Sequence, residues 1–192
     1  MGGPYPVFMS REVIPSQKRP AWANSDPLLA HYFDTEWGRE VRDERGLFER
    51  LALEGFQAGL TWLLILKRRE TLNAEFANFD PDTVARFTED DVERIASNPD
   101  MIRNKRKIRA VITNAQATIA LRERGGLAEL IWSFAPETQP RYTHADDAPT
   151  QSTESAALAK ELKRHGFTFV GPVSMYALME AIGMVTYGTQ SV

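Results

Sequence analysis

Helix-forming patterns cover almost the whole chain, and this feature constrains the fold most. Apolar residues recur at three- and four-residue spacing, and capping residues precede several of these stretches. The expected helices span 27–36, 46–57, 61–76, 88–97, 108–124, 127–134, 153–164 and 172–182, with a short one after Pro81. Only 167–170 alternates between apolar and polar residues, and four residues are too few to build a sheet. The sequence therefore predicts an all-α fold.

One acidic residue interrupts the most apolar stretch of the chain. Glu54 lies within 51–66, where Gln57 and Thr61 are the only other polar side chains. A buried, unpaired carboxylate is costly, so it becomes neutral or finds a partner. On one continuous helix Trp62 would lie two turns beyond it. Glu54 is then either an acid that holds a flat, cationic or hydrogen-bond-donating ligand, or a helix-boundary residue bonded to nearby backbone N–H groups.

Composition excludes several classes of protein. The 192 residues contain no cysteine, which excludes disulfides and thiolate metal sites and fits a reducing cytoplasm. No apolar run approaches the ~20 residues that span a bilayer, so no membrane association is expected. Residues 1–18 lack the pattern of a secretory signal and are rich in glycine and proline, so we expect a flexible N-terminal extension there.

The densest positive cluster lies between two expected helices, in a chain of net charge −3. Free backbone N–H groups at the start of the second helix would already favour an anion. An external phosphate would explain the basic side chains, which suggests a helix-hairpin-helix that grips the nucleic-acid backbone. A solvated helix face explains them equally well, and the usual glycines are replaced by Asp100 and Arg106. The cluster consists of Arg103, Lys105, Arg106, Lys107 and Arg109.

Several segments form an ordered set of motifs. They are Trp22, Ser25-Asp26-Pro27-Leu28, Tyr32, Asp34-Thr35-Glu36-Trp37-Gly38 and Leu53-Glu54-Gly55-Phe56-Gln57-Ala58-Gly59-Leu60-Thr61-Trp62. This order resembles the 3-methyladenine DNA glycosylase I family. The resemblance continues through 66–70, 79–81, 102–114, 132–134 and 166–171. It covers about 19–184, so we expect one glycosylase domain there and a C-terminal tail over 185–192.

The resemblance implies a helix-hairpin-helix glycosylase fold, with two helical lobes and a cleft between them. It also implies monofunctional hydrolysis of the N-glycosidic bond of 3-methyladenine after base flipping, with double-stranded DNA as the partner and a monomeric protein. Glu54 matches the glutamate that contacts the base. Tyr32 and Trp62 match aromatics that stack on it, and Trp22 matches another pocket wall. Gln57, Gly59 and Leu60 match the segment that fills the gap left in the DNA.

These roles agree with the chemistry of the substrate. An alkylated adenine in DNA carries a positive charge and is already a good leaving group. The pocket therefore needs aromatic faces and a carboxylate, rather than a strong acid. No lysine is placed as an evident Schiff-base nucleophile, so we expect no strand cleavage.

The chain departs from the family at a metal site. Typical members hold a structural zinc with two cysteines and two histidines. Here Pro20 and Phe33 stand where the first Cys and the first His are expected, and 185–192 contains neither residue type. His31, His144 and His165 are scattered along the chain. We therefore expect no cofactor and no metal, with apolar packing that includes Phe33 in place of the zinc.

A second departure is Leu29, where typical members have a pocket tyrosine. Losing that hydroxyl can weaken discrimination between related bases. A catalytically impaired module that binds DNA lesions with the same fold is therefore the alternative to an active glycosylase. A sequence-specific helix-turn-helix regulator fits less well, because the charge is clustered at a hairpin and no dimerisation segment is visible.

Overall fold

The computed structural model describes residues 19–140 and 148–186, and its regular elements are helices. The α-helices are α1 (Pro27–Thr35), α2 (Glu44–Gln57), α3 (Trp62–Glu75), α4 (Pro81–Val84), α5 (Glu89–Ser97), α6 (Lys105–Leu121), α7 (Gly126–Trp132), α8 (Thr153–Arg164) and α9 (Pro172–Ala181). Three short 3₁₀ turns are η1 (Ala21–Asn24), η2 (Ala77–Phe79) and η3 (Arg122–Arg124). The all-α prediction is confirmed, whereas the two lobes and the cleft between them stay a prediction.

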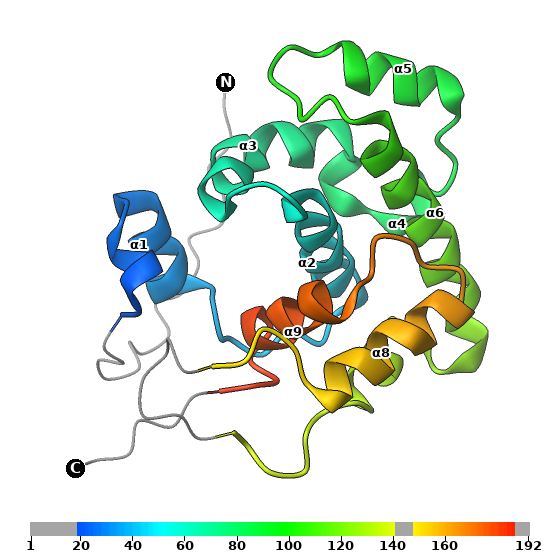
Figure 1. The fold of residues 1–192 in the computed structure, drawn as a ribbon. Helices are drawn as coiled ribbons and strands as arrows, with labels where there is room; N and C mark the ends of the chain where they lie inside the picture. The colour runs from blue at the N-terminus through cyan, green and yellow to red at the C-terminus, as the bar shows by residue number, and fades with distance from the viewer. Residues whose placement is uncertain (1–18, 141–147, 187–192) are drawn as a thin grey trace, which may run out of the picture.

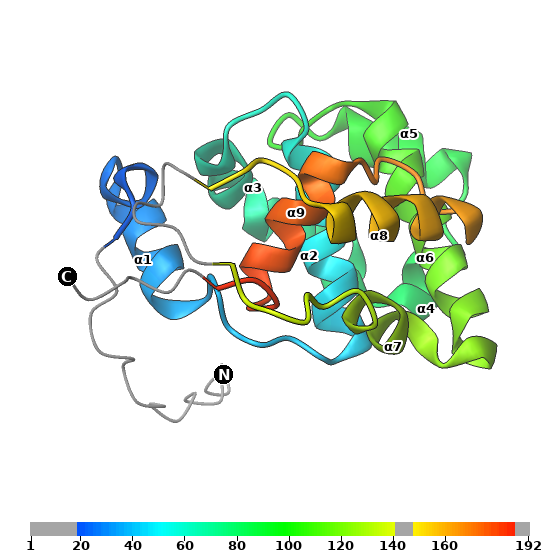
Figure 2. The same ribbon diagram turned by 60° about the horizontal axis from the view of Figure 1, so that its bottom comes forward.

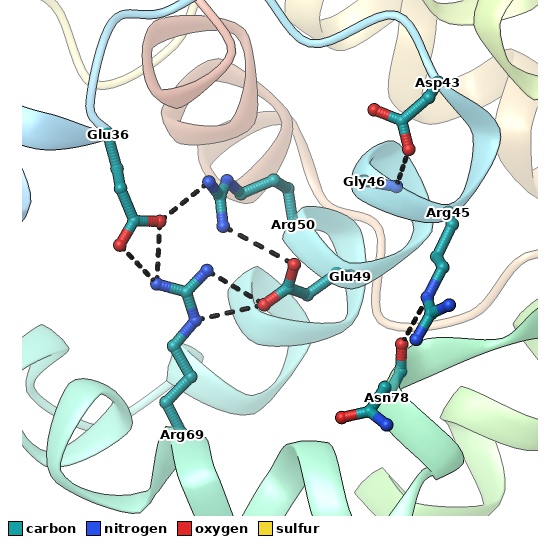
Figure 3. Close-up of polar contacts among 8 residues, drawn as sticks. All are labelled: Glu36, Asp43, Arg45, Gly46, Glu49, Arg50, Arg69 and Asn78. Carbon is teal, nitrogen blue, oxygen red and sulfur yellow. Dashed lines mark hydrogen bonds and ion pairs between the residues drawn. The ribbon is translucent and has the colours of Figure 1, made fainter. Parts of the chain in front are cut away.

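Capping residues set the helix boundaries much as the sequence suggests. Asp26 accepts a hydrogen bond from Leu28 N at 2.8 Å, and Thr88 and Asp91 form the expected capping box. Helix α2 begins two residues earlier than expected, because the Asp43 carboxylate accepts from Gly46 N at 2.7 Å (Figure 3).

Helix α2 is the centre of the core. It packs against α3, α6, α7 and α9, and its buried side chains include Phe48, Leu51 and Phe56. Figure 1 shows α9 next to α2 near the centre, α8 at the lower right, and α4, α5 and α6 at the right and upper right. Figure 2 shows α7 beneath α2 and α6. Residues that belong to α2 are therefore surrounded by helices from both halves of the sequence.

Helix α1 lies at one side of this assembly (Figure 1), and an aromatic cluster holds η1 against it. The Phe33 ring stacks on Trp37 with centroids 5.2 Å apart. Trp22 meets both rings edge-on, at 5.7 and 5.9 Å. The expected apolar packing around Phe33 is therefore present; its role as a replacement for zinc stays a prediction.

The C-terminal end of α9 returns to the segment that follows α1. Gly38 N donates to Ala181 O at 3.1 Å. Gly183 has a φ of +73°, and a Cβ there would lie 2.7 Å from Gly38 O, so only glycine fits this approach. Val185 is 2% exposed and belongs to the core, so the first residue of the expected tail is packed.

Residues 1–18 and 187–192 lie outside the described residues, so the extension and the rest of the tail stay predictions. No described helix is both long and apolar enough to cross a membrane.

One local expectation needs correction. Glu54 and Trp62 do not share a helix, because α2 ends at Gln57 and α3 begins at Trp62. The alternating segment 167–170 forms no strand, in agreement with its short length; Phe169 takes a left-handed conformation with a φ of +56° that interrupts extended backbone.

Candidate functional site: a buried glutamate beside two aromatic rings

Glu54 lies in the last turn of α2 and is only 4% exposed. Its carboxylate makes no hydrogen bond or ion pair with any described residue. The interpretation as a boundary residue bonded to backbone N–H groups is therefore wrong. Burial raises the pKa of Glu54 to about 8, the charge of Glu180 adds to this rise, and Arg50 opposes it.

Tyr32 and Trp62 lie against each other, with ring centroids 5.4 Å apart. Tyr32 comes from α1 and Trp62 is the first residue of α3, where Thr61 caps the helix through Leu64 N. The Tyr32 hydroxyl and the Trp62 indole N–H are both buried and have no hydrogen-bond partner. Burial raises the pKa of Tyr32, and the charge of Glu54 contributes to this rise.

Three buried polar groups without partners therefore occur where α1, α2 and α3 meet. Buried polar atoms in folded proteins are nearly always hydrogen-bonded, so such a set indicates a place where a ligand supplies the missing bonds. The two rings touch, which leaves no room for a third ring between them. A flat ligand would stack on one face of the pair or move one ring. Leu29, one turn before Tyr32 on the buried side of α1, is 6% exposed and gives this region an apolar wall.

Arg50 lies one turn before Glu54 on α2 and is held by an ion-pair network (Figure 3). Its Nη2 donates to Glu36 at 2.8 Å, and Arg69 bridges Glu36 and Glu49 at 2.7 and 2.9 Å. These four side chains join the end of α1 to α2 and α3. Burial alone would raise the pKa of Glu36, but Arg69 and Arg50 hold it below its usual range. The Arg50 Nε and Nη1 atoms are buried without a hydrogen bond.

Trp22 belongs to the aromatic cluster that joins η1 to α1. Its ring contacts are to Phe33 and Trp37, and it is 38% exposed. Among the described residues its ring makes no aromatic contact with Tyr32 or Trp62. Its assignment as a pocket wall stays a prediction.

The turn between α2 and α3 contains the residues expected to approach DNA. Leu60 N donates to Gln57 O at 2.7 Å, and the Gln57 side chain donates to Leu60 O at 3.2 Å. Gly59 has a φ of +78° with open space around it, so the turn needs glycine for its backbone and not for lack of room. Ala58 and Gly59 are exposed, and Leu60 is partly buried against the core.

The basic cluster occupies the loop between α5 and α6 and the first turn of α6, as expected. Lys105 pairs with Glu93 at 2.6 Å and Arg109 pairs with Glu89 at 2.8 Å, so both charges are already balanced. Arg103 and Arg106 are exposed and pair with no described residue.

The N-terminus of α6 differs from expectation. The Asn104 side chain accepts from the backbone N–H groups of Arg106 and Lys107, at 3.1 and 3.2 Å. These donors are therefore not free for an anion.

Lys107 also differs from the expected phosphate contact. It is 7% exposed, and its Nζ donates to Phe56 O and Ala58 O, each at 2.6 Å. Desolvation lowers its pKa. The ammonium group thus caps the C-terminus of α2 and fastens the basic hairpin to the α2–α3 turn.

The residues present do not fit a structural zinc. Pro20 has no ligating side chain, and Phe33 is part of the aromatic cluster. Within 19–140 and 148–186 no three His, Cys, Asp or Glu side chains are arranged to hold a metal ion. His144 lies outside the described residues.

Sequence reasoning missed two charged residues near Glu54. Arg50 was missed because it lies in an ordinary amphipathic helical pattern. Its spacing of four residues from Glu54 nevertheless places both side chains on the same face of α2. Glu180 is the only charged residue between Gly166 and Val192. It is therefore a single acid in an uncharged stretch, which is the pattern that identified Glu54.

Comparisons with known proteins agree with this arrangement. The family model described as methyladenine glycosylase matches residues 22–191. The Escherichia coli K12 protein "DNA-3-methyladenine glycosylase 1" is 42% identical over 172 residues, covering 88% of this chain and 91% of that protein. The "DNA-3-methyladenine glycosylase" of Haemophilus influenzae is 37% identical over 168 residues, covering 85% and 90%.

Solved structures share the fold. A crystal structure of 3-methyladenine DNA glycosylase I superposes with a TM-score of 0.83 at 43% identity, covering 88% of this chain and 94% of that one. A Staphylococcus aureus structure that describes 3-methyladenine recognition by the same enzyme gives 0.80 at 34% identity, covering 87% and 89%. The chain therefore belongs to the methyladenine glycosylase family.

Proposed function

We propose that this protein removes 3-methyladenine from DNA by hydrolysing its N-glycosidic bond. The observation that carries the proposal is the buried, unpartnered carboxylate of Glu54, close to the unpartnered Tyr32 hydroxyl and Trp62 indole. The family of the chain and the names of its relatives support the same reaction.

The charge of the substrate explains the role of Glu54. With a pKa of about 8, Glu54 is mostly protonated at pH 7 in the empty site. A cationic base beside it favours the ionised form, so binding is linked to the release of a proton. Affinity for the cation therefore rises with pH until the carboxyl group is ionised before the base arrives.

The chemical step needs no strong acid. Water adds its oxygen to the sugar carbon, and the electrons of the N-glycosidic bond move to the cationic ring. The ring leaves as a neutral base, and the water releases one proton to solvent. Glu54 stabilises the cation in the pocket, while Tyr32 and Trp62 bind its flat face. Lys107 is the one buried lysine among the described residues and is held by two carbonyls, so we propose a monofunctional enzyme that leaves the strand intact.

The base must leave the stack to reach Glu54, which costs a few kcal/mol and less for a damaged base. We assign Gln57, Gly59 and Leu60 to the segment that fills the resulting gap, because their turn is partly exposed and directly continues α2.

Arg103 and Arg106 are the available phosphate contacts of the hairpin, which is fastened to the same turn through Lys107. We propose that a monomer acts on double-stranded DNA, in the cytoplasm.

Release of free base from methylated duplex DNA tests this function. The wild-type protein should release 3-methyladenine and leave the strand uncut, and Glu54→Ala should release far less. A folded protein that binds damaged duplex without releasing base would identify a lesion-binding module instead.

A further inference from the structure

Glu180 lies in the last turn of α9, which packs against α2, the helix that carries Glu54 (Figures 1 and 2). Its side chain is partly buried and has no hydrogen bond or ion pair with the residues described. Helices α2 and α9 pack together, and the charge of Glu180 contributes to the raised pKa of Glu54. Two acids from neighbouring helices therefore share one desolvated region, and neither has a protein partner.

The helix termini strengthen this arrangement. Both acids lie in the last turn of their helices, where unpaired carbonyls concentrate negative charge and disfavour an anion. Gly38 N donates a hydrogen bond to Ala181 O, and Lys107 Nζ donates to the carbonyls of Phe56 and Ala58. These donors balance part of the negative charge at the two helix ends. Two carboxylates at helix C-termini therefore lower the stability of the ligand-free protein. The same negative charge favours a cationic ligand.

Resting on the proposed function, we propose that Glu180 is a second base-recognition acid, which faces Glu54 from α9 and selects positively charged purines over neutral ones. One proton on either of the two carboxyl groups leaves the empty site with a single negative charge and one O–H donor. A cationic adenine presents positive charge and amino hydrogens to these acceptors. A neutral base gains no comparable attraction, and it meets the same desolvated acids.

Ionisable side chains on α1, α2 and α3 also belong to the region around the pair. Arg50 on α2 opposes the rise in the pKa of Glu54, and Tyr32 faces it from α1. On α3, Arg69 is bound by Glu36 and Glu49.

Charged groups on two further helices that pack against α2 or α9 are also paired. On α6, Lys107 is bound by backbone carbonyls. On α8, which packs against α9, Glu161 is paired with Arg164 and His165. Burial raises the pKa of Glu180 to about 7, near that of its neighbour.

The experiment compares the pH dependence of base release by wild type, Glu180→Gln and Glu180→Asp. Release of 3-methyladenine, and of hypoxanthine as a neutral base, is followed from duplex DNA between pH 5.5 and 9.5. Glu180→Gln removes the repulsion, so the pH midpoint for 3-methyladenine should fall by about half a unit or more, and the high-pH plateau of kcat/KM should fall about tenfold. Glu180→Asp should restore most of the wild-type profile. Preference for the cationic base should weaken only in the glutamine variant.

Glu161→Gln is the matched control, because Glu161 is a partly buried glutamate on the neighbouring helix. It should leave the profile unchanged. A Glu180→Gln profile equal to that of wild type, or an equal shift in Glu161→Gln, overturns the proposal.

Carbon-13 NMR titration of the glutamate carboxyl groups gives a test that does not need activity or a variant. Glu54 and Glu180 should titrate as a coupled pair, in two steps. Independent titrations would overturn the proposal for Glu180. Wild-type protein that releases no base at any pH would instead overturn the proposed function.

Discussion

Replacing Glu54 with glutamine tests the charge of this side chain while keeping its shape. A cation about 4 Å from a carboxylate gains about 4 kcal/mol at an effective dielectric constant of about 20. With a pKa of about 8, ionising Glu54 at pH 7 costs about 1.4 kcal/mol. The difference of about 2.6 kcal/mol corresponds to a decrease of about 80-fold in kcat/KM at pH 7.

The ratio of wild-type to Glu54→Gln activity should also depend on pH. At pH 9 the carboxyl group is ionised before the base arrives, so the full ~4 kcal/mol is lost in Glu54→Gln and the ratio of wild type to variant rises about tenfold. Single-turnover release of labelled 3-methyladenine from methylated duplex measures this ratio. A ratio below about fivefold at pH 7, or one that stays constant up to pH 9, would refute the reasoning.

Three further predictions concern stability and DNA binding. Folded Glu54 keeps a proton that the unfolded chain releases between about pH 4.5 and 8, so the free energy of unfolding should fall as pH rises, by up to ~1.4 kcal/mol per unit. Urea unfolding should show Glu54→Gln to be more stable at pH 8 and nearly equal to wild type at pH 4. Arg103→Ala and Arg106→Ala should each reduce the slope of the logarithm of the DNA-binding constant against the logarithm of the salt concentration by about one. Lys105→Ala should change this slope less, because Glu93 already balances the charge of Lys105. Lys107→Met should lower the free energy of unfolding by about 2–3 kcal/mol, because two carbonyls lose their donor, without changing the salt slope; unchanged stability would contradict the capping role.

The helices were predictable because their signals are local. Asp26, Thr88 and Ser152 each cap a helix through atoms within three residues, and sequence spacing contains that information. Glu54 was predictable for a related reason, since it is the only charged residue in the apolar stretch 51–66.

Contacts between distant segments could not be predicted from local patterns. Lys107 looks like its basic neighbours in the sequence, but 49 to 51 residues separate it from the carbonyls it caps. Trp22 joins Phe33 and Trp37 through the folding of η1 onto α1, which its spacing from Tyr32 does not reveal. The break between α2 and α3 was predictable from the sequence, because it falls at Gly59, which has a positive φ.

The central claim is that the unpartnered groups of Glu54, Tyr32 and Trp62 receive the extruded base. A crystal structure of the protein with free 3-methyladenine tests it most directly. We expect the ring to stack on Tyr32 or Trp62, with a Glu54 oxygen within hydrogen-bond distance of the base. A base bound elsewhere, with Glu54 still unpartnered, would contradict the account.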